Sequence, residues 1–330
     1  MGEDSRDGKG PKAIGELLPT LKGVPTPTAP RPAPKSLQQR LLDYAEVEGG
    51  AEPTEILYQH SVLCQTCLPY RNPGDQVRLW ARKNGFVRLE VAAGRAYDSR
   101  ADDFVDVGLP FGPKPRLVLY HLNAEALRTQ SPMIELEDSL TAFVKRTLGL
   151  DTGGRNIRTV KEQLSRLSAS DFRIGTSHED RSVTIKGSIV EGFELWTPRD
   201  AKQRTLWPTT VQFSPRYFES LMRHAVPLNE MAIRHLAHNA MALDLYTWLA
   251  QRLHRIDPAK ASVFVPWKGL KEHFGHGYGR MDNFKRVFRD TLRQVKAVYP
   301  QAKFDLDSGG MRLKHSRPPV EGRLLSLKPE

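Results

Sequence analysis

A run of cationic side chains near the C-terminus is the sequence feature with the clearest chemistry. Residues 282–298, DNFKRVFRDTLRQVKAV, contain Arg286, Arg289 and Arg293, which are spaced by three and four residues. A guanidinium group donates paired hydrogen bonds to guanine O6 and N7, and it also binds phosphate. Arginines that share one side of a helix therefore favour a partner made of nucleic acid.

The same stretch has apolar residues at helical spacing. At 100° per residue, the side chains within about 80° of Phe284 form a stripe wide enough to pack on a core. This stripe consists of Val287, Phe288, Thr291, Leu292, Val295 and Val298. Asp282 is a candidate N-cap, and Pro300 ends the helix after Tyr299. The pattern predicts a helix that is buried on one side and cationic on the other.

The alternative for this cationic side is an ordinary solvated face. Solvated helix faces usually mix acidic and basic residues at helical spacing. Here only Asp282 and Asp290 oppose the cations between Arg280 and Lys296. Like charges repel one another at these spacings, so an anionic partner is the better explanation.

Composition agrees with a polyanionic partner. The chain has 330 residues, a net charge of +11 and a pI near 9.6. Its length predicts about two domains, but charge alone does not separate DNA, RNA and an acidic membrane surface. The N-terminus lacks the apolar run of a secretory signal, and the longest uncharged stretch, Ile56–Tyr70, is too short and polar to span a bilayer. We expect a soluble, cytoplasmic protein with no membrane partner.

Metal and redox chemistry has a weak basis in this sequence. Cys64 and Cys67, in CQTC, have the spacing of half a zinc site or of a redox pair. A second pair of ligands at the usual distance is missing, so two structural cysteines in a strand or turn are the better interpretation. His235 and His238 are a two-ligand fragment, and we expect them to be satisfied or solvent-facing. We predict no metal and no cofactor.

Catalytic motifs for nucleic-acid enzymes are also missing. The chain has no GxxxxGK[ST] motif, which argues against a P-loop ATPase, and no His-apolar-His triplet of the metal-dependent nicking initiators. We therefore predict a protein that is not an enzyme. A nuclease or relaxase with an unrecognised catalytic site stays open as an alternative.

Changes in composition divide the chain into four predicted segments. Residues 1–52 form a Pro-rich, disordered arm that ends in a short helix, SLQQRLLDYAEV. Residues 53–204 and 205–320 form two domains, and residues 321–330 form a tail.

Both predicted domains run helix, short helix, turn with glycines, basic helix and β-hairpin, and the first domain also begins with strands. In the first domain, strands are predicted in EILYQHSVLCQTCLPY, QVRLWARK and FVRLEVAAG. Helices are predicted in KPRLVLYHLNAEALRTQ, in DSLTAFVKRTLG up to Gly149, and in RNIRTVKEQLSRLSAS, before a meander of FRIGTS, RSVTIKGSIV and GFELWTP. In the second, TVQFSPRYFESLMRH leads into the helices NAMALDLYTWLAQRLHRI and KGLKEHFG, the basic helix and the hairpin KFDLDSGGMRLKH. This order is typical of a winged helix-turn-helix, so the predicted fold class is α+β with two tandem winged helix-turn-helix domains.

A short sequence echo supports a duplication. Asn156 to Val160 and Asn283 to Val287 both read Asn, apolar, basic, any residue, Val, and both follow a turn that contains glycine. The letters alone are a weak match. The echo gains weight because it falls at the same place in the same order of elements.

The second helix of a helix-turn-helix enters the major groove, and the wing usually contacts phosphates. We accordingly predict DNA-binding residues on both basic helices and on the C-terminal hairpin. They are Arg155, Arg158, Thr159, Arg166, Arg280, Lys285, Arg286, Arg289, Arg293, Lys296, Arg312 and Lys314. Arg286 or Arg289 is expected to contact bases. Wing contacts from Arg181 and Lys186 are a further possibility, although the hairpin cations could equally be plain surface charges.

Several longer stretches resemble a known family. They are PFGPKPRLVLYHLNAEALRTQSPMIEL, the Gly-Gly-Arg turn before VKEQLSRL, LDLYTWLAQRL, VPWKGLKEHFG, FKRVFRDTLRQV and SGGMRLKHSRPPV. Over residues 110–320 the chain resembles the plasmid-encoded RepA-type replication initiators. The resemblance implies a bacterial protein that binds repeated sequences, called iterons, at a plasmid origin, helps to open the duplex and recruits host replication proteins such as the replicative helicase. It also implies a switch between monomer and homodimer. A transcriptional repressor with the same modules and no role in initiation is the alternative.

Overall fold

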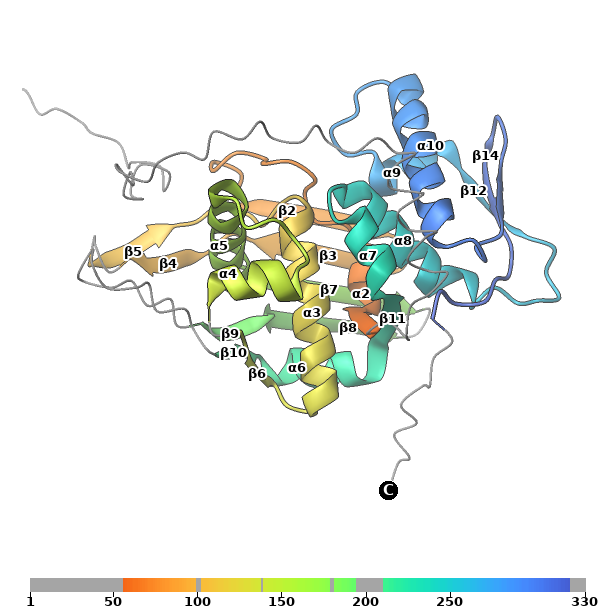
Figure 1. Ribbon diagram of the computed structural model, residues 1–330. Helices are drawn as coiled ribbons and strands as arrows, with labels where there is room; N and C mark the ends of the chain where they lie inside the picture. The colour runs from red at the N-terminus through yellow and green to blue at the C-terminus, as the bar shows by residue number, and fades with distance from the viewer. Residues whose placement is uncertain (1–55, 99–101, 138, 179–180, 194–209, 321–330) are drawn as a thin grey trace, which may run out of the picture. The chain divides into compact units, whose positions relative to one another are not determined.

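The computed structural model describes residues 56–98, 102–137, 139–178, 181–193 and 210–320 (Figure 1). The predicted arm, residues 1–52, and the predicted tail, residues 321–330, lie outside these described residues. The helices are α2 Ser61–Gln65, α3 Pro113–Thr129, α4 Leu140–Ala142, the π-helix η2 Phe143–Thr147, α5 Gly154–Ser168, α6 Pro215–His224, α7 Glu230–Leu236, α8 Ala240–Leu253, α9 Trp267–Phe274 and α10 Met281–Val298. The fold is mixed α+β with several small sheets, which confirms the predicted class at that level.

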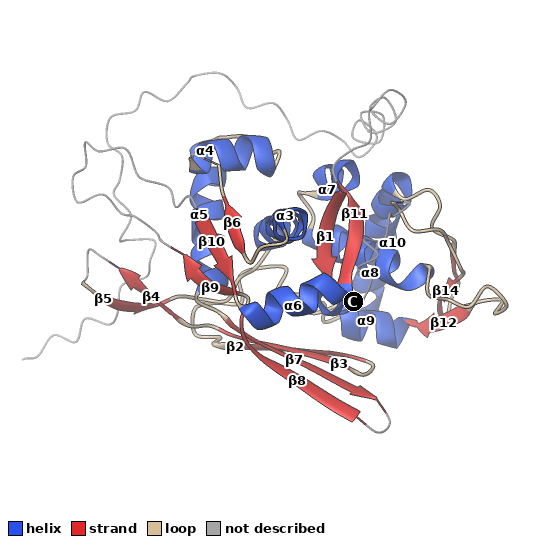
Figure 2. Cartoon of the chain, turned by 90° about the horizontal axis from the view of Figure 1, so that it is seen from below, coloured by secondary structure: helices blue, strands red, loops and turns tan. Residues whose placement is uncertain are grey.

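Every strand pair among the described residues is antiparallel. The largest described sheet has the order β2–β3–β7–β8, and it lies on one side of helices α3 and α6 (Figure 2). The other sheets are β1–β11, β6–β10–β9, β12–β14–β13 and β4–β5. The strand bounds are β1 Ile56–His60, β2 Leu79–Asn84, β3 Val87–Ala92, β4 Arg95–Asp98, β5 Asp103–Asp106, β6 Met133–Glu135, β7 Asp171–His178, β8 Arg181–Ser188, β9 Val190–Phe193, β10 Thr210–Phe213, β11 Ala225–Asn229, β12 Val263–Pro266, β13 Phe304–Leu306 and β14 Gly310–Leu313.

Two of these sheets join strands from both predicted domains. β1 pairs with β11, and β6 pairs with β10. Strands that precede residue 204 in the sequence are thus bonded to strands that follow it. The boundary between residues 204 and 205 itself lies outside the described residues, so the division at that point stays a prediction.

The sequence predicts the positions of the long helices correctly. α3, α5, α8, α9 and α10 all lie where the periodicity predicts them. α3 begins with Pro113 at its first position, where the missing backbone donor costs nothing, and it ends at Gln130, whose φ is +52°. The predicted helix through DSLTAFVKRTLG differs, because only α4 is α-helical and η2 continues it as a π-helix up to the turn at Gly149, whose φ is +61°.

Two strand predictions need correction. The stretch EILYQHSVLCQTCLPY is not one strand but β1 followed by the short helix α2. The turn between them forms because the His60 ring accepts a hydrogen bond from the backbone N–H of Val62 at 3.2 Å. The predicted meander is also wrong in its last step, because β9 pairs with β10 instead of β8.

A buried ion pair joins α3 to α8 inside the core. Arg116 is 2% exposed and Asp244 is 6% exposed. The Arg116 Nε and Nη2 atoms donate to the two Asp244 carboxylate oxygens at 2.6 and 2.7 Å. Burial disfavours the charged form of both side chains, and it raises the pKa of Asp244. The Asp244 carboxylate outweighs burial at Arg116 and raises the pKa of that guanidinium. Each charge therefore depends on the other to remain in the interior.

The cysteines belong to this core. Cys64 and Cys67 are both 2% exposed, and Cys64 lies in α2 instead of the predicted strand or turn. Burial raises the pKa of both thiols, so they stay protonated and unreactive at neutral pH. The backbone oxygen of Cys67 accepts a hydrogen bond from Trp80 Nε1 at 2.7 Å. These contacts give the CQTC stretch a packing role.

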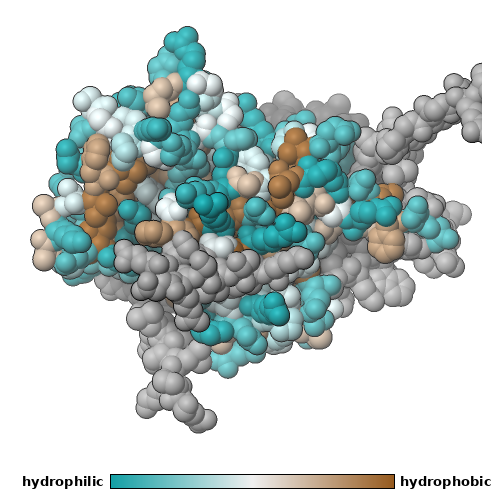
Figure 3. Space-filling view, turned by 180° about the vertical axis from the view of Figure 1, so that it is seen from behind, coloured by the Kyte–Doolittle hydropathy of each residue, from teal (hydrophilic) through white to brown (hydrophobic). Residues whose placement is uncertain are grey.

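The surface carries apolar side chains among hydrophilic ones. Figure 3 shows this on the face opposite to that of Figure 1, where separate apolar patches are surrounded by hydrophilic residues. The most exposed large apolar side chains are Phe86, Met133, Phe104, Leu79, Phe264 and Val77. Phe86, 63% exposed, follows the Asn84-Gly85 turn between β2 and β3 and takes part in a pocket described below.

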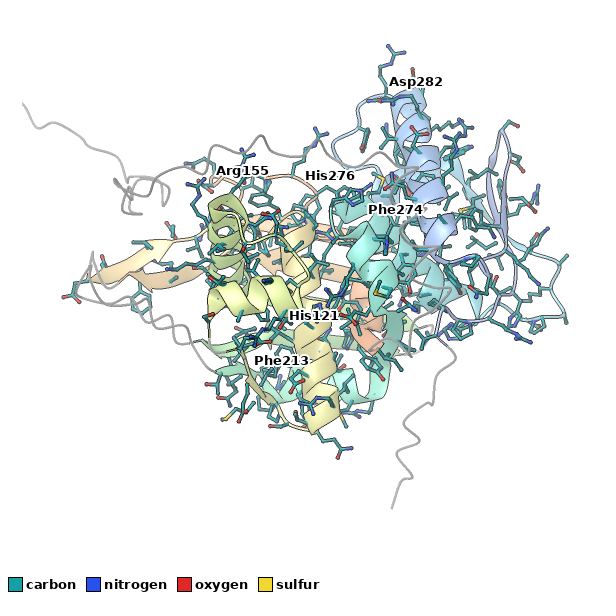
Figure 4. The ribbon with its side chains drawn as sticks, in the orientation of Figure 1. His121, Arg155, Phe213, Phe274, His276 and Asp282 are labelled. Carbon is teal, nitrogen blue, oxygen red and sulfur yellow. The ribbon has the colours of Figure 1, made fainter. Side chains whose placement is uncertain are left out.

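We predict that stability falls as pH drops below 6.5. His121 in α3 is buried (Figure 4), and burial, with Arg234 nearby, lowers its pKa from 6.5 to about 3. The unfolded chain therefore binds a proton that the folded chain does not, so this contribution to stability is complete above pH 6.5 and is lost toward pH 3. His121 alone should remove about 2 kcal/mol between pH 6.5 and pH 5. Urea unfolding of the wild type and of His121→Leu at pH 7 and pH 5 measures the difference; an identical pH dependence contradicts the prediction.

Candidate nucleic-acid interface

The predicted phase of α10 is confirmed. Its buried residues are Phe284, Phe288, Thr291, Leu292, Val295 and Val298, and Val287 is half-buried. The opposite side presents Arg286, Arg289, Arg293 and Lys296 to solvent, with Lys285 half-buried. One detail differs from the sequence prediction: Arg280 occupies the N-cap position, and Asp282 lies in the first turn (Figure 4). The helix is thus buried on one side and cationic on the other.

Trp267, the first residue of α9, lies beneath two of these cations. Its ring is buried, and its Nε1 donates to the backbone oxygen of Asp307 at 3.1 Å, which fixes the indole. The Arg289 Cζ and the Lys285 Nζ both lie 5.1 Å from the ring centroid. A cation over an aromatic face is attracted by the ring quadrupole, so this contact orders both side chains on the outer surface. Among the described residues, no carboxylate pairs with either cation.

The other arginines of α10 have acidic neighbours on the same helix. Asp290 lies 2.7 Å from Arg293 and 4.0 Å from Arg286, and Asp282 lies 2.7 Å from Arg280. All of these groups are exposed, and exposed ion pairs contribute only about 0–1 kcal/mol. Such pairs are weak enough for the guanidinium groups to exchange their partner for a phosphate. Arg289 and Lys285 have no acidic partner among the described residues, so they can bind a phosphate without first breaking an ion pair.

Lys296 and the hairpin cations are held by local contacts. Lys296 Nζ donates to the backbone oxygens of Pro300 and Ala302, so it closes the C-terminal end of α10. In the β13–β14 hairpin, Arg312 lies 3.3 Å from Asp307 and Lys314 lies 2.7 Å from Asp305. The predicted wing residues Arg312 and Lys314 would therefore have to exchange these acidic neighbours for phosphates in order to contact DNA.

A groove runs between α10 and β13. It has a volume of about 540 Å³. Its walls are Arg289, Leu292, Arg293, Lys296, Ala297, Phe304 and Leu306. The combination of an apolar floor with three cations suits a partner that carries both phosphate and an apolar edge, such as a thymine methyl group.

The cationic face of α5 is smaller. Arg155 and Arg158 are exposed, and Figure 4 shows Arg155 at the N-terminal end of the helix. The Thr159 hydroxyl donates to the backbone oxygen of Arg155 at 2.8 Å, so it is turned to its own helix. The N-terminal ends of α5 and α10, marked by Arg155 and Asp282, lie on the same side of Figure 4.

The outward orientation predicted for Arg166 is wrong. This side chain is 6% exposed, and its Nη2 lies 2.9 Å from Glu162 and 3.3 Å from Asp75. Its Nη1 donates to the backbone oxygen of Leu109 at 3.2 Å. Asp75 and Leu109 lie in segments far from α5 in the sequence that pack against this end of the helix, which the periodicity of one helix does not reveal. Arg166 is thus a packing residue of the described fold.

No curated protein sequence matches the chain. Two crystal structures of domains 2 and 3 of RctB are similar to it, each with 11% sequence identity and a TM-score of 0.46. The first covers 78% of this chain and 99% of that chain, and the second covers 77% and 96%. None of the helices in the described ranges is both long and apolar enough to cross a membrane.

The family model described as plasmid-encoded RepA protein matches residues 109–268. The matched range begins just before α3 and reaches the start of α9, so α10 and the β13–β14 hairpin lie beyond it. It includes the stretches around α3, α5 and α8 on which the sequence resemblance was based. Residues 109–268 of the chain are therefore similar to plasmid-encoded RepA proteins.

Proposed function

We propose that this chain initiates plasmid replication by binding repeated origin sequences with two winged helix-turn-helix modules. The observation that carries the proposal is the solvent-facing set of cations on α10, with Arg289 and Lys285 held over Trp267. An ordered guanidinium group on an exposed helix loses little conformational entropy when it binds a base. The match of residues 109–268 to the family model of plasmid-encoded RepA protein supports the assignment to plasmid replication.

The second module has the element order α8, β12, α9, α10, β13, β14. Its sheet order, β12–β14–β13, places the first strand beside the hairpin that follows the basic helix. This arrangement supports a winged helix in which α10 enters the major groove and the hairpin forms the wing. The side of α10 that faces the core is then the side predicted from its apolar stripe.

For the first module we propose α3, α4, α5 and the β7–β8 hairpin as the equivalent elements. Asn156 and Asn283 are each the third residue of their helix, which supports a common origin for α5 and α10. Arg155 and Arg158 are the candidate contacts on α5, and Arg181 and Lys186 lie in β8, its proposed wing. Recruitment of the replicative helicase and a switch to a homodimer are further parts of this proposal.

Complementation tests the initiation role. A plasmid that carries the cognate origin but lacks this gene should replicate only when the protein is supplied in trans. Failure to restore replication, with specific origin binding retained in vitro, favours the alternative of a transcriptional repressor. We also propose that the protein has no catalytic chemistry of its own, and nicking of supercoiled origin DNA in the presence of Mg²⁺ or Mn²⁺ would overturn that part.

Replacing Arg289 with alanine should weaken specific DNA binding by about 1–3 kcal/mol, because a bidentate contact to guanine is lost. The matched control is Arg128→Ala, which removes the same charge from an exposed position on α3. Equilibrium binding of both variants to origin repeats and to a scrambled duplex separates base contact from general attraction. Equal losses for the two variants contradict a role of Arg289 in recognition.

Binding should also weaken steeply as salt increases. If Lys285, Arg286, Arg289 and Arg293 each neutralise one phosphate, the slope of log affinity against log salt should be about −3 to −4. The slope arises because each contact releases a counterion from the duplex. Titrations at several salt concentrations measure it, and an affinity that is flat between low and moderate salt rules out this interface.

A further inference from the structure

A basic pocket lies away from the α10 surface, where α2, α6, α8 and the β2–β3 turn meet. It has a volume of about 670 Å³. Arg252 and Arg255 enter it from the C-terminal end of α8, His224 from the end of α6, and His60 from the cap of α2. The pocket thus collects four side chains that can carry positive charge from three separate elements.

The described residues supply no acidic partner for these groups. No carboxylate is among the residues that line the pocket, and within the described ranges no acid forms an ion pair with Arg252 or Arg255. Burial and the neighbouring His224 lower the pKa of His60 to about 4. Burial, Arg223 and Arg255 lower the pKa of His224. Both rings resist protonation partly because the charges around them are positive. An anion in the pocket would meet the same positive potential.

Some buried donors in and near the pocket have no acceptor. Within the described structure, Arg252 Nε, Arg82 Nε and Nη2, and His273 Nε2 are buried and make no hydrogen bond. Of these residues, only Arg252 lines the pocket, and His273 is linked to it through Asn84, whose Nδ2 contacts Gln65 O at 2.8 Å and His273 Nδ1 at 3.4 Å. A buried donor without an acceptor costs about 1–3 kcal/mol, so such a group calls for a ligand.

The remaining walls indicate the kind of ligand. The volume falls in the range of small-molecule sites and exceeds the need of a simple inorganic ion. Val87 and Ile174 give an apolar wall, and the exposed Phe86 ring stands at the rim. Two arginine forks match the oxygens of a phosphate group, whereas an apolar wall and a ring match an organic body.

We propose that this pocket binds a small organic phosphate of the nucleotide type, with the phosphate at Arg252 and Arg255 and the organic body against Phe86 and Val87. Such a group occurs in a free nucleotide and at the phosphorylated end of a nucleic-acid strand. Both present the same chemistry to the pocket. Neither source involves the α10 face, so the site is separate from the proposed duplex contacts.

Calorimetric titration of the full chain tests the proposal with four probes: ATP, AMP, adenosine and a short 5′-phosphorylated single strand. Saturable binding of ATP or AMP without binding of adenosine is expected. Binding of the phosphorylated strand, but not of its unphosphorylated form or of the free nucleotides, supports the same pocket with the strand as its source. If no probe carrying phosphate binds, the proposal is wrong.

Paired variants locate the site. Arg252→Gln with Arg255→Gln should weaken binding by roughly 10- to 100-fold, because hydrogen bonds to charged groups are lost. Arg128→Gln with Arg173→Gln removes the same charge from exposed positions and should leave the affinity unchanged. Arg255→Gln alone, at an exposed position, serves if the double variant does not fold, as judged by circular dichroism. Equal affinity of the pocket and control variants overturns the proposal.

Discussion

Replacing Asp244 with alanine should lower the free energy of unfolding by about 3–5 kcal/mol, because it leaves a charged guanidinium in the interior without its partner. Arg116 is 2% exposed, and both of its bonds to Asp244 are shorter than 2.8 Å. Its Nη1 and Nη2 also donate to the backbone oxygens of Gly112 and Leu68 at 2.6 and 2.8 Å. These carbonyls hold the guanidinium in place, so it cannot move to solvent when the carboxylate is removed.

The matched control is Asp290→Ala. Asp290 contacts Arg293 at 2.7 Å, but this pair is exposed, so its loss should change stability by about 0–1 kcal/mol. The double variant Arg116→Met with Asp244→Leu should recover much of the loss, because it removes both buried charges together. Urea unfolding followed by circular dichroism gives all three values. A loss of less than about 1 kcal/mol for Asp244→Ala would mean that the buried pair is replaced by solvent contacts.

This ion pair also bears on how the chain is divided. Arg116 lies in the first predicted domain and Asp244 in the second, and the β1–β11 and β6–β10 pairs cross the same boundary. If the contacts act together, Asp244→Ala shifts one cooperative transition. If residues 53–204 and 205–320 unfold independently, two transitions separate instead. The same experiment therefore tests the predicted division.

The sequence was sufficient for features that depend on one helix. The apolar stripe of α10 and the outward direction of Arg286, Arg289 and Arg293 follow from helical periodicity alone, and the structure confirms them. The helix is long, and its two faces differ sharply in polarity. An error of one turn in the predicted bounds of α10 would not change which of its residues face the core.

Features that depend on distant segments could not be predicted this way. The burial of Arg166 requires Asp75 and Leu109, which are far from it in the sequence. The pairing of β9 with β10 depends on how the sheets meet. Trp267 was also missed as the support of the basic face, since its sequence, VPWKGLKEHFG, shows only an aromatic residue before a short helix.

One missed residue did leave a signal. Asp244 lies in a helix in which all residues except Arg252 are buried, and a lone carboxylate in such a helix needs a partner. The sequence does not name that partner, because Arg116 is one of many cations in the chain. Tertiary packing determines that Arg116 is the partner of Asp244.

Replacing Phe288 with alanine should cost about 3–5 kcal/mol of stability, since the side chain is fully buried and its removal leaves a cavity. Its ring lies 5.4 Å from that of Phe284, 5.7 Å from Trp267 and 5.8 Å from Phe274. Neighbouring Val287→Ala is the control, because Val287 is only half-buried and its loss should cost less. Because Trp267 packs on Phe288 and also supports Arg289, the folded fraction of Phe288→Ala should also bind origin DNA more weakly than the Val287 variant. Thermal unfolding and DNA binding of both variants measure the two effects, and an unchanged melting temperature for Phe288→Ala would mean that the opposite side of α10 faces the core.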